Sequence, residues 1–403
     1  MSDEQWSIRF DFLFIVNYSL LIIMKVLICA GGTGGHIYPA LAAVTELQRM
    51  GVATSDLLWL GTTGKVEEEL VPRAGLRLET LAGGAVVSSV PFHQKVLNGL
   101  KLTAGIKTAV SHINTFKPDV MFMTGGYTAV SVTIAARLRR VPVVTYLPDI
   151  EPGSTIKMMM RFTDKVACTS PSSDQFLPRQ KMVVTGYPVR DEVRAAAQLS
   201  KANALAQFEL TTERKTLFVF GGSRGALNIN TALMDNLPAL LQEVQIIHIS
   251  GTLTWPQVEE NAAALPAELR AHYRPYPYLH DRMGAAFRAA DLAMARSGAS
   301  MLGECPAFGL PSILVPLTFA WRYQKVNADY LTERGAAIQS TDETLADDLP
   351  AIVLDLLADE ARLQQMGQAA AAMDEPNAAM KLAELITAVG RPSVGHSKEG
   401  ANV

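Results

Sequence analysis

At three places in this chain an apolar segment runs straight into a glycine-rich turn, and a helical pattern of apolar residues follows at once. The three turns are residues 31–35, 124–127 and 221–226. Glycine lets backbone N–H groups approach a ligand closely, and the N-terminus of the following helix favours negative charge. Such strand–loop–helix units open both halves of the chain. This repetition predicts an α/β protein with two doubly wound, Rossmann-like parallel-sheet domains that face each other across a cleft.

Length and composition limit the class of protein. A chain of 403 residues exceeds one ordinary core and fits two domains of typical size. Apolar residues make up 49% and charged residues 19%, as in globular proteins. The net charge of −3 leaves no basic excess to neutralise a phosphate backbone, so we expect no nucleic-acid partner. The three cysteines, Cys29, Cys168 and Cys305, form no C-x-x-C, which predicts neither a disulfide nor a zinc site.

Shifts in composition divide the chain into parts. The expected parts are an extension (1–23), a first domain (24–190), a linker region (191–214), a second domain (215–390) and a disordered tail (391–403). The extension is expected to lie outside the fold, and Met24 to be the working start, because Met24 already begins the first strand. Its apolar part is shorter than the ~20 residues of a spanning helix. A membrane-touching anchor is the alternative for this extension.

Strands and helices alternate along both halves, which indicates parallel sheets. Besides the strands that precede the three turns, strands are expected at 57–60, 76–81, 141–146, 165–168, 181–184, 245–249, 291–295 and 312–315. Residues 83–117 combine many apolar side chains with His93, Lys95, Lys101 and Lys107. Two interpretations of this segment stay open: it lies on an anionic membrane surface, or it is an ordinary amphipathic helix packed on the sheet.

Polar residues gather after the expected strands of the second half. Glu304 follows the turn at 296–299, and a carboxylate there can accept both hydrogens of a vicinal diol such as that of ribose. Ser223 and the neighbouring amides would meet a diphosphate at a helix N-terminus. Gln324 and Asn327, three apart on one helical face, suit the hydroxyls of a sugar. The alternative for each of these residues is a helix cap or a solvated face.

Five motifs in this order resemble the MurG family, the bacterial UDP-N-acetylglucosamine:lipid I N-acetylglucosaminyltransferases that complete the disaccharide unit of the peptidoglycan precursor. The motifs are residues 31–36, 124–127, 186–190, 221–226 and 296–304. The resemblance implies a GT-B architecture and an inverting transfer of GlcNAc from UDP-GlcNAc. The implied acceptor is the MurNAc 4-hydroxyl of a polyprenyl-diphosphate-linked sugar peptide. It also implies a peripheral position at the cytoplasmic face of the plasma membrane.

The resemblance implies roles for individual residues. Ser223 matches the serine of a diphosphate loop and Glu304 a ribose-gripping glutamate. The other donor-side positions are Thr33, Gly34, Gly35, Arg190, Arg296, Gln324 and Asn327, and the acceptor-side positions are Gly125, Gly126 and Tyr127. His36, at the mouth of the first glycine turn, is the expected general base, because an imidazole titrates near the operating pH. Asp149 is its rival.

The chain departs from the family pattern at two places. Family members carry a histidine and an asparagine after the segment that matches residues 141–145, and this chain has Tyr146 and Asp149 there. Residues 84–88 replace a basic segment of the family, so acceptor contacts in that loop are not carried over.

Other functions stay open on the sequence. One is a GT-B glycolipid transferase or a UDP-sugar epimerase with a different substrate, and another is a non-enzymatic nucleotide-sugar-binding module. No D-x-D occurs in the chain, so we expect no metal at the diphosphate and no cofactor.

Overall fold

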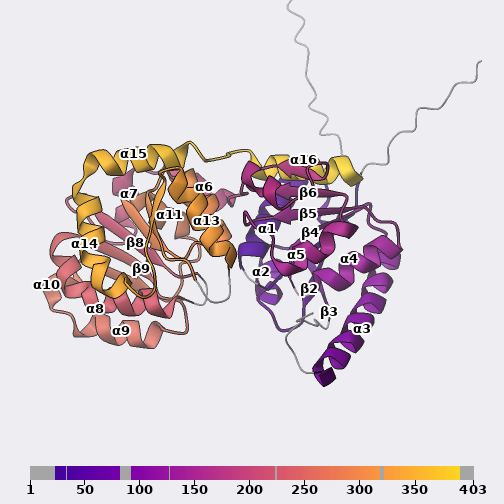
Figure 1. Ribbon diagram of the computed structural model, residues 1–403, viewed down its shortest axis with the longest axis horizontal. Helices are drawn as coiled ribbons and strands as arrows, with labels where there is room; N and C mark the ends of the chain where they lie inside the picture. Colours follow the sequence, from indigo (N-terminus) through magenta and orange to yellow (C-terminus); the bar gives the residue numbers. More distant parts are fainter. Residues whose placement is uncertain are drawn as a thin grey trace, which may run out of the picture.

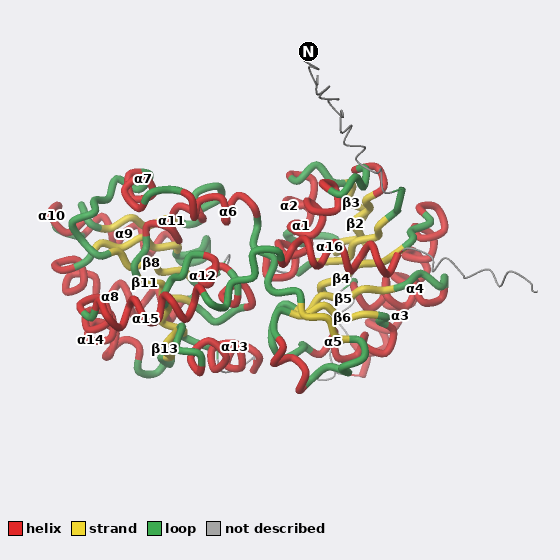
Figure 2. Tube along the Cα trace, turned by 90° about the horizontal axis from the view of Figure 1, so that it is seen from above, coloured by secondary structure: helices red, strands yellow, loops and turns green. Residues whose placement is uncertain are grey.

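The computed structural model describes residues 23–390 except 33, 82–91, 127, 223–224 and 318–321. These residues form two domains side by side, each built on a parallel sheet with helices on both faces (Figures 1 and 2). The expected doubly wound α/β fold is therefore confirmed.

The first domain holds a 7-stranded sheet with the order β3-β2-β1-β4-β5-β6-β7. Its strands are β1 (Val26–Ala30), β2 (Leu57–Thr62), β3 (Arg77–Leu81), β4 (Val120–Gly125), β5 (Val143–Leu147), β6 (Lys165–Cys168) and β7 (Met182–Val184). The helices between them are α1 (Gly34–Arg49), α2 (Glu67–Arg73), α3 (Phe92–Phe116), α4 (Ala129–Leu138) and α5 (Ser154–Met159).

The second domain holds a 6-stranded sheet with the order β10-β9-β8-β11-β12-β13. Its strands are β8 (Thr216–Phe220), β9 (Gln245–Ile249), β10 (Tyr273–Tyr276), β11 (Leu292–Ala295), β12 (Ser312–Leu314) and β13 (Ala337–Gln339). Its helices are α6 (Asp191–Ala195), α7 (Lys201–Ala206), α8 (Leu227–Glu243), α9 (Trp255–Ala264), α10 (Ala267–Arg270), α11 (Met283–Ala289), α12 (Glu304–Ala307), α13 (Arg322–Glu333), α14 (Leu345–Ala358) and α15 (Glu360–Ala371).

The central strands are apolar throughout because both of their faces are covered. All five residues of β1 are buried. Val26 and Ile28 belong to the hydrophobic cluster on one face of the sheet, and Leu27 and Cys29 to the cluster on the other. This alternation places successive side chains in separate cores, which explains a continuous apolar run in a buried parallel strand.

The last helix, α16 (Ala378–Gly390), returns to the first domain (Figure 1). Its apolar face, with Leu382, Ala383 and Ile386, joins the core that contains Val26 and Ile28. The second structural domain therefore ends before α16, which differs from the expected limit at 390. The expected linker also differs, because Val193, Leu205, Phe208 and Leu210 are buried in the core of the second domain.

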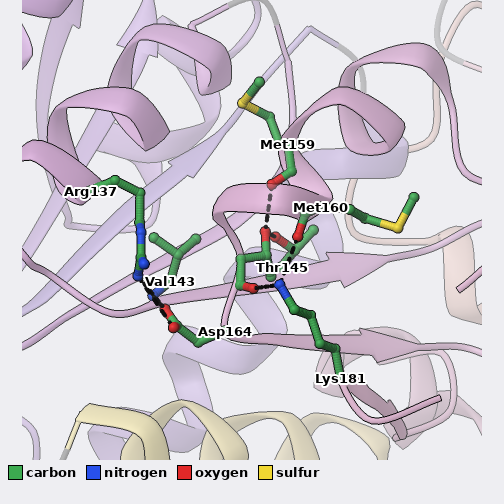
Figure 3. A network of polar contacts seen from close by, with 8 residues as sticks. Arg137, Val143, Thr145, Met159, Met160, Asp164 and Lys181 are labelled. Atoms are coloured by element: carbon green, nitrogen blue, oxygen red, sulfur yellow. Dashed lines mark hydrogen bonds and ion pairs between the residues drawn. The ribbon is translucent and has the colours of Figure 1, made fainter. Parts of the chain in front are cut away.

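A network of polar contacts joins the amino ends of neighbouring strands in the first sheet (Figure 3). Asp164 accepts from Arg137 on α4 at 3.2 Å and from the backbone N–H of Val143, which begins β5, at 2.8 Å. Lys181 donates to the backbone carbonyl of Thr163 at 2.6 Å. These bonds connect α4, β5, β6 and β7 at the amino ends of the strands, opposite to the glycine turns. They therefore support the fold and involve none of the residues at the carboxyl ends.

Helix α3 projects beyond the rest of the first domain (Figure 1). Ala109, Ile113 and Phe116 are buried in the core of that domain, whereas Lys101 and Lys107 are exposed. None of the helices in the described part of the chain is long and apolar enough to cross a membrane.

Candidate functional site

Four loops that the sequence singles out lie at the carboxyl ends of the central strands, two in each domain. In the first domain they follow β1 and β4, and in the second they follow β8 and β11. In each sheet these two neighbouring strands mark the place where the strand order reverses. Ligands of open α/β sheets bind in the crevice at such a switch point. Each domain therefore carries a glycine-rich loop at its own switch point, and the cleft between them stays a prediction.

His36 lies in the first turn of α1, directly after Gly34 and Gly35. Its ring packs against Gly125, where an added Cβ would lie 3.0 Å from Cε1 of the histidine. Gly125 has φ +132°, a conformation that also favours glycine. The Thr124 hydroxyl donates to the backbone carbonyl of His36 at 2.8 Å. The end of β4 thus contacts His36 twice, at its ring through Gly125 and at its backbone through Thr124.

The state of the His36 ring suits proton acceptance. Burial lowers the pKa of His36 below its usual value, so the ring is neutral at physiological pH. Its Nδ1 atom is buried and has no hydrogen-bond partner among the described residues. A neutral imidazole can accept a proton at its unprotonated ring nitrogen. Because Nδ1 is buried beside Gly125, proton transfer from a substrate hydroxyl to Nε2 stays a prediction.

Arg190 and Glu304 form a second polar group, at the boundary between the domains. Glu304 begins α12 and is only 8% exposed. Burial raises the pKa of Glu304, and the positive charge of Arg190 opposes that rise. The Arg190 guanidinium lies 4.0 Å from the centre of the Tyr38 ring, and its Nε atom is buried without a partner among the described residues. A partly buried guanidinium with an unused Nε–H, next to a buried carboxylate, can bind a polar ligand.

Tyr38 brings the first domain into this group. Its hydroxyl shares a hydrogen bond of 2.7 Å with the hydroxyl of Tyr278, which follows β10 in the second domain. Sequence reasoning missed both tyrosines. The only local signal for Tyr38 is its place two residues after His36, and Tyr278 carries none.

Asn327 joins the domains a second time. Its Nδ2 atom donates to Asp149 Oδ1 at 2.8 Å and to the Ser297 carbonyl at 3.1 Å, and its Oδ1 atom accepts from the Ile150 amide at 3.1 Å. Asn327 is fully buried. In this structure the whole amide is engaged by protein groups, and its expected contact with a donor sugar stays a prediction.

Gln324 and Arg296 also contact the protein in this structure. The Gln324 side-chain oxygen accepts from the Leu317 amide at 3.0 Å. Arg296 pairs with Asp342 at 2.8 Å and donates to the Val315 carbonyl at 3.1 Å. Both residues thus order the loops after β11, β12 and β13, and their direct donor contacts stay predictions.

Tyr146 and Asp149, the two departures from the family pattern, differ in their surroundings. Tyr146 is buried, its hydroxyl bonds to Thr169 at 2.8 Å, and burial raises its pKa well above the usual value. It therefore stays neutral and supports the fold. Burial also raises the pKa of Asp149, to about 6, while the bond from Asn327 opposes the rise.

Several expected site residues lie outside the described residues: Thr33, Tyr127 and Ser223. Residues 84–88 also lie outside them. Gly126 is described, and an added Cβ there would lie 3.0 Å from the carbonyl oxygen of Gly31, so the loops after β4 and β1 touch. In the described ranges, no three His, Cys, Asp or Glu side chains gather in a way that could hold a metal ion.

Two parallel-sheet domains, each with a glycine-rich loop at its switch point, define a nucleotide-sugar enzyme of the GT-B class. The glycosyltransferase family 28 N-terminal domain matches residues 26–168, and the family 28 C-terminal domain matches residues 216–382. The chain belongs to the MurG family of these glycosyltransferases.

Curated relatives carry one name, UDP-N-acetylglucosamine–N-acetylmuramyl-(pentapeptide) pyrophosphoryl-undecaprenol N-acetylglucosamine transferase. The protein from a Roseiflexus species is 36% identical, over 90% of this chain and 94% of its own. The protein from Halalkalibacterium halodurans is 34% identical, over 91% of this chain and 100% of its own.

Solved structures agree with this assignment. Acinetobacter baumannii MurG superimposes with a TM-score of 0.69 at 25% identity, covering 91% of this chain and 99% of that one. UDP-GlcNAc 2-epimerase from Neisseria meningitidis also superimposes, with a TM-score of 0.64 at 14% identity and with 91% and 100% coverage. At that identity the second likeness concerns the fold alone.

Proposed function

We propose that the protein transfers GlcNAc from UDP-GlcNAc to the 4-hydroxyl of MurNAc in undecaprenyl-diphospho-MurNAc-pentapeptide, lipid I, and so forms lipid II for peptidoglycan. The function named for relatives that match nine-tenths of the chain supports this reaction. It makes the enzyme a UDP-GlcNAc-dependent hexosyltransferase.

One structural observation carries the proposal. Both domains contribute to a single, partly buried polar group, in which Tyr38 of the first domain stacks on Arg190 and bonds to Tyr278 of the second. Glycosyl transfer needs donor and acceptor in one water-poor place, because ordering the reactants removes much of the entropic barrier. A module that only binds a nucleotide sugar needs one loop set, and this chain has one in each domain.

In the proposed reaction His36 acts as the general base. It takes the proton from the acceptor hydroxyl while that oxygen bonds to the anomeric carbon of GlcNAc on the face opposite to UDP. The bond from the anomeric carbon to the diphosphate oxygen breaks with its electron pair, and UDP leaves. The N-terminus of α8 and the Arg190 guanidinium would stabilise the charge on UDP. Glu304 would hold the ribose hydroxyls.

The rival base, Asp149, is less suitable in its present surroundings. Its Oδ1 atom already accepts the hydrogen bond from Asn327. Only its Oδ2 atom is then left to take a proton from a substrate. Nδ1 of His36 has no hydrogen-bond partner among the described residues, so no such bond holds that nitrogen.

The acceptor carries a polyprenyl chain, so we further propose that the protein works as a peripheral enzyme at the cytoplasmic face of the plasma membrane. The exposed Lys101 and Lys107 on α3 would face anionic headgroups there. Cosedimentation with anionic vesicles should fall when both lysines become glutamine, and binding that is equal for neutral and anionic vesicles would refute this contact.

The test of the proposed function is UDP release with a set of acceptors. UDP should appear with UDP-GlcNAc and lipid I together, and should not appear with either substrate alone. Soluble N-acetylhexosamines should give no release. Conversion of UDP-GlcNAc to its 2-epimer, followed by NMR in the absence of lipid I, would instead favour the epimerase alternative.

A further inference from the structure

The first glycine loop is held by a buried carboxylate that belongs to another element. Glu67, the first residue of α2, has no exposed surface. Figures 1 and 2 place α2 beside α1, on the side of the first domain that faces the second. Carboxylates are rarely buried completely, because removal of the charge from water costs much free energy unless hydrogen bonds compensate it.

Two backbone amides supply the compensation. Oε1 of Glu67 accepts from the Thr62 N–H at 2.9 Å, and Oε2 accepts from the Gly32 N–H at 3.2 Å. Thr62 ends β2 and Gly32 lies in the loop after β1. The single carboxylate therefore bridges the loop that leads to His36 and the end of the neighbouring strand.

The glycines around Glu67 fit this arrangement. A Cβ on Gly31 would overlap Oε1 of Glu67, and a Cβ on Gly61 would lie 2.8 Å from its Cγ. Gly31 in turn contacts Gly126, in the loop after β4. Gly31 and Gly61 thus make room for a protein carboxylate, whereas the sequence suggests for Gly31 only that it lets a ligand approach.

We propose that Glu67 is a positioning residue for the transfer reaction: it holds the loop at 31–35 so that His36 meets the acceptor hydroxyl. Its Oε2 atom also occupies the Gly32 amide, so the phosphate groups of a substrate must bind elsewhere on the loop. This inference rests on the proposed function.

The test compares Glu67→Gln with Glu68→Gln in the full chain. The two changes are chemically identical and adjacent, but Glu68 is exposed. An amide at 67 keeps one acceptor oxygen and loses the other, so one of the two hydrogen bonds that join the loop to the end of β2 is lost. We expect kcat with lipid I to fall roughly 10- to 100-fold in Glu67→Gln, because small misplacements of a catalytic group have effects of this size. The KM for UDP-GlcNAc should change less than kcat does, the stoichiometry of UDP binding should stay within about twofold of wild type, and Glu68→Gln should match wild type.

Two outcomes overturn the inference. One is a kcat within about twofold of wild type in Glu67→Gln. The other is a loss of UDP-binding stoichiometry in proportion to kcat, since Glu67 would then only support folding. If Glu67→Gln does not fold, Gly31→Ala provides the second variant, because its methyl group displaces the carboxylate; it should show the same separation of kcat from donor KM. Absence of transfer by the wild-type chain would refute the proposed function instead, so the two failures are distinguishable.

Discussion

Asn327 of α13 donates a hydrogen bond of 2.8 Å to Asp149, which follows β5 in the other domain. Asp149 stands where the family carries asparagine, so the chain has a titratable group at a contact between its domains. Burial raises the pKa of this carboxyl to about 6. The carboxyl that accepts this hydrogen bond between the domains therefore changes its charge near pH 6.

Asp149→Asn should stabilise the protein above pH 6. The folded pKa of Asp149, about 6, lies above the ordinary value of 3.8, so its contribution to stability is complete below about pH 4 and is lost as the pH rises through 6. Asparagine carries no charge and its oxygen still accepts from Asn327. After allowance for the partial solvent contact of Asp149, we expect a gain of about 1–3 kcal/mol in the free energy of unfolding at pH 7.5.

Urea unfolding at pH 4 and pH 7.5 checks this expectation. The variant and the wild type should differ at pH 7.5 and agree at pH 4. An equal difference at both values would mean that ionisation of Asp149 plays no part. The same variant should retain kcat within a few-fold of wild type, because His36 is the proposed base.

His36→Ala should lower kcat by roughly 10²–10⁴, the range for loss of general-base catalysis, and leave UDP affinity nearly unchanged. Because burial lowers the pKa of His36, the acid limb of kcat/KM in the wild type should lie below pH 6.5. That limb should vanish in the variant. His272→Ala is the control, since His272 precedes β10 at the opposite end of the sheet. A limb that persists in His36→Ala and vanishes in Asp149→Asn would assign the base to Asp149.

Glu304→Ala should weaken use of the donor more than use of the acceptor. Loss of a carboxylate that accepts two ribose hydroxyls should cost on the order of 2–4 kcal/mol in kcat/KM for UDP-GlcNAc, taking charged hydrogen bonds at ~1.5–3 kcal/mol each. Steady-state kinetics with each substrate varied in turn measures the effect. A raised KM for lipid I at an unchanged donor KM would place Glu304 outside the ribose site.

Transfer should continue after exhaustive EDTA treatment. The prediction rests on the absence of D-x-D from the sequence and on helix dipoles and arginine as the groups that stabilise UDP. UDP release should stay within a small factor of the untreated rate. A collapse that Mg²⁺ or Mn²⁺ restores would show that a cation supports the leaving group.

The sequence was sufficient to predict the central strands and the loops after them. Strands such as β1 and β8 are buried on both faces, and the glycine turns mark their ends. Strands β10 and β13, each at an edge of the second sheet, were missed. Pro275 interrupts the strand pattern of β10, because proline cannot donate to the ladder, and β13 has only three residues, two of them partly exposed.

Contacts between distant segments could not be predicted. The return of α16 to the first domain depends on which core its apolar face fits, and periodicity does not contain that information. Asp149 and Asn327 are 178 residues apart along the chain. Glu67 is hidden within three consecutive glutamates, and only the fold separates the buried one from its exposed neighbours.

The product formed from UDP-GlcNAc and lipid I tests most directly whether the protein transfers GlcNAc to the MurNAc 4-hydroxyl. Mass spectrometry and NMR should identify a single new lipid that carries GlcNAc on the MurNAc 4-hydroxyl, with a large anomeric coupling that reports the inverted, β configuration. UDP should form in equal amount. An α linkage, attachment at another position, or UDP release without a new lipid would contradict the account.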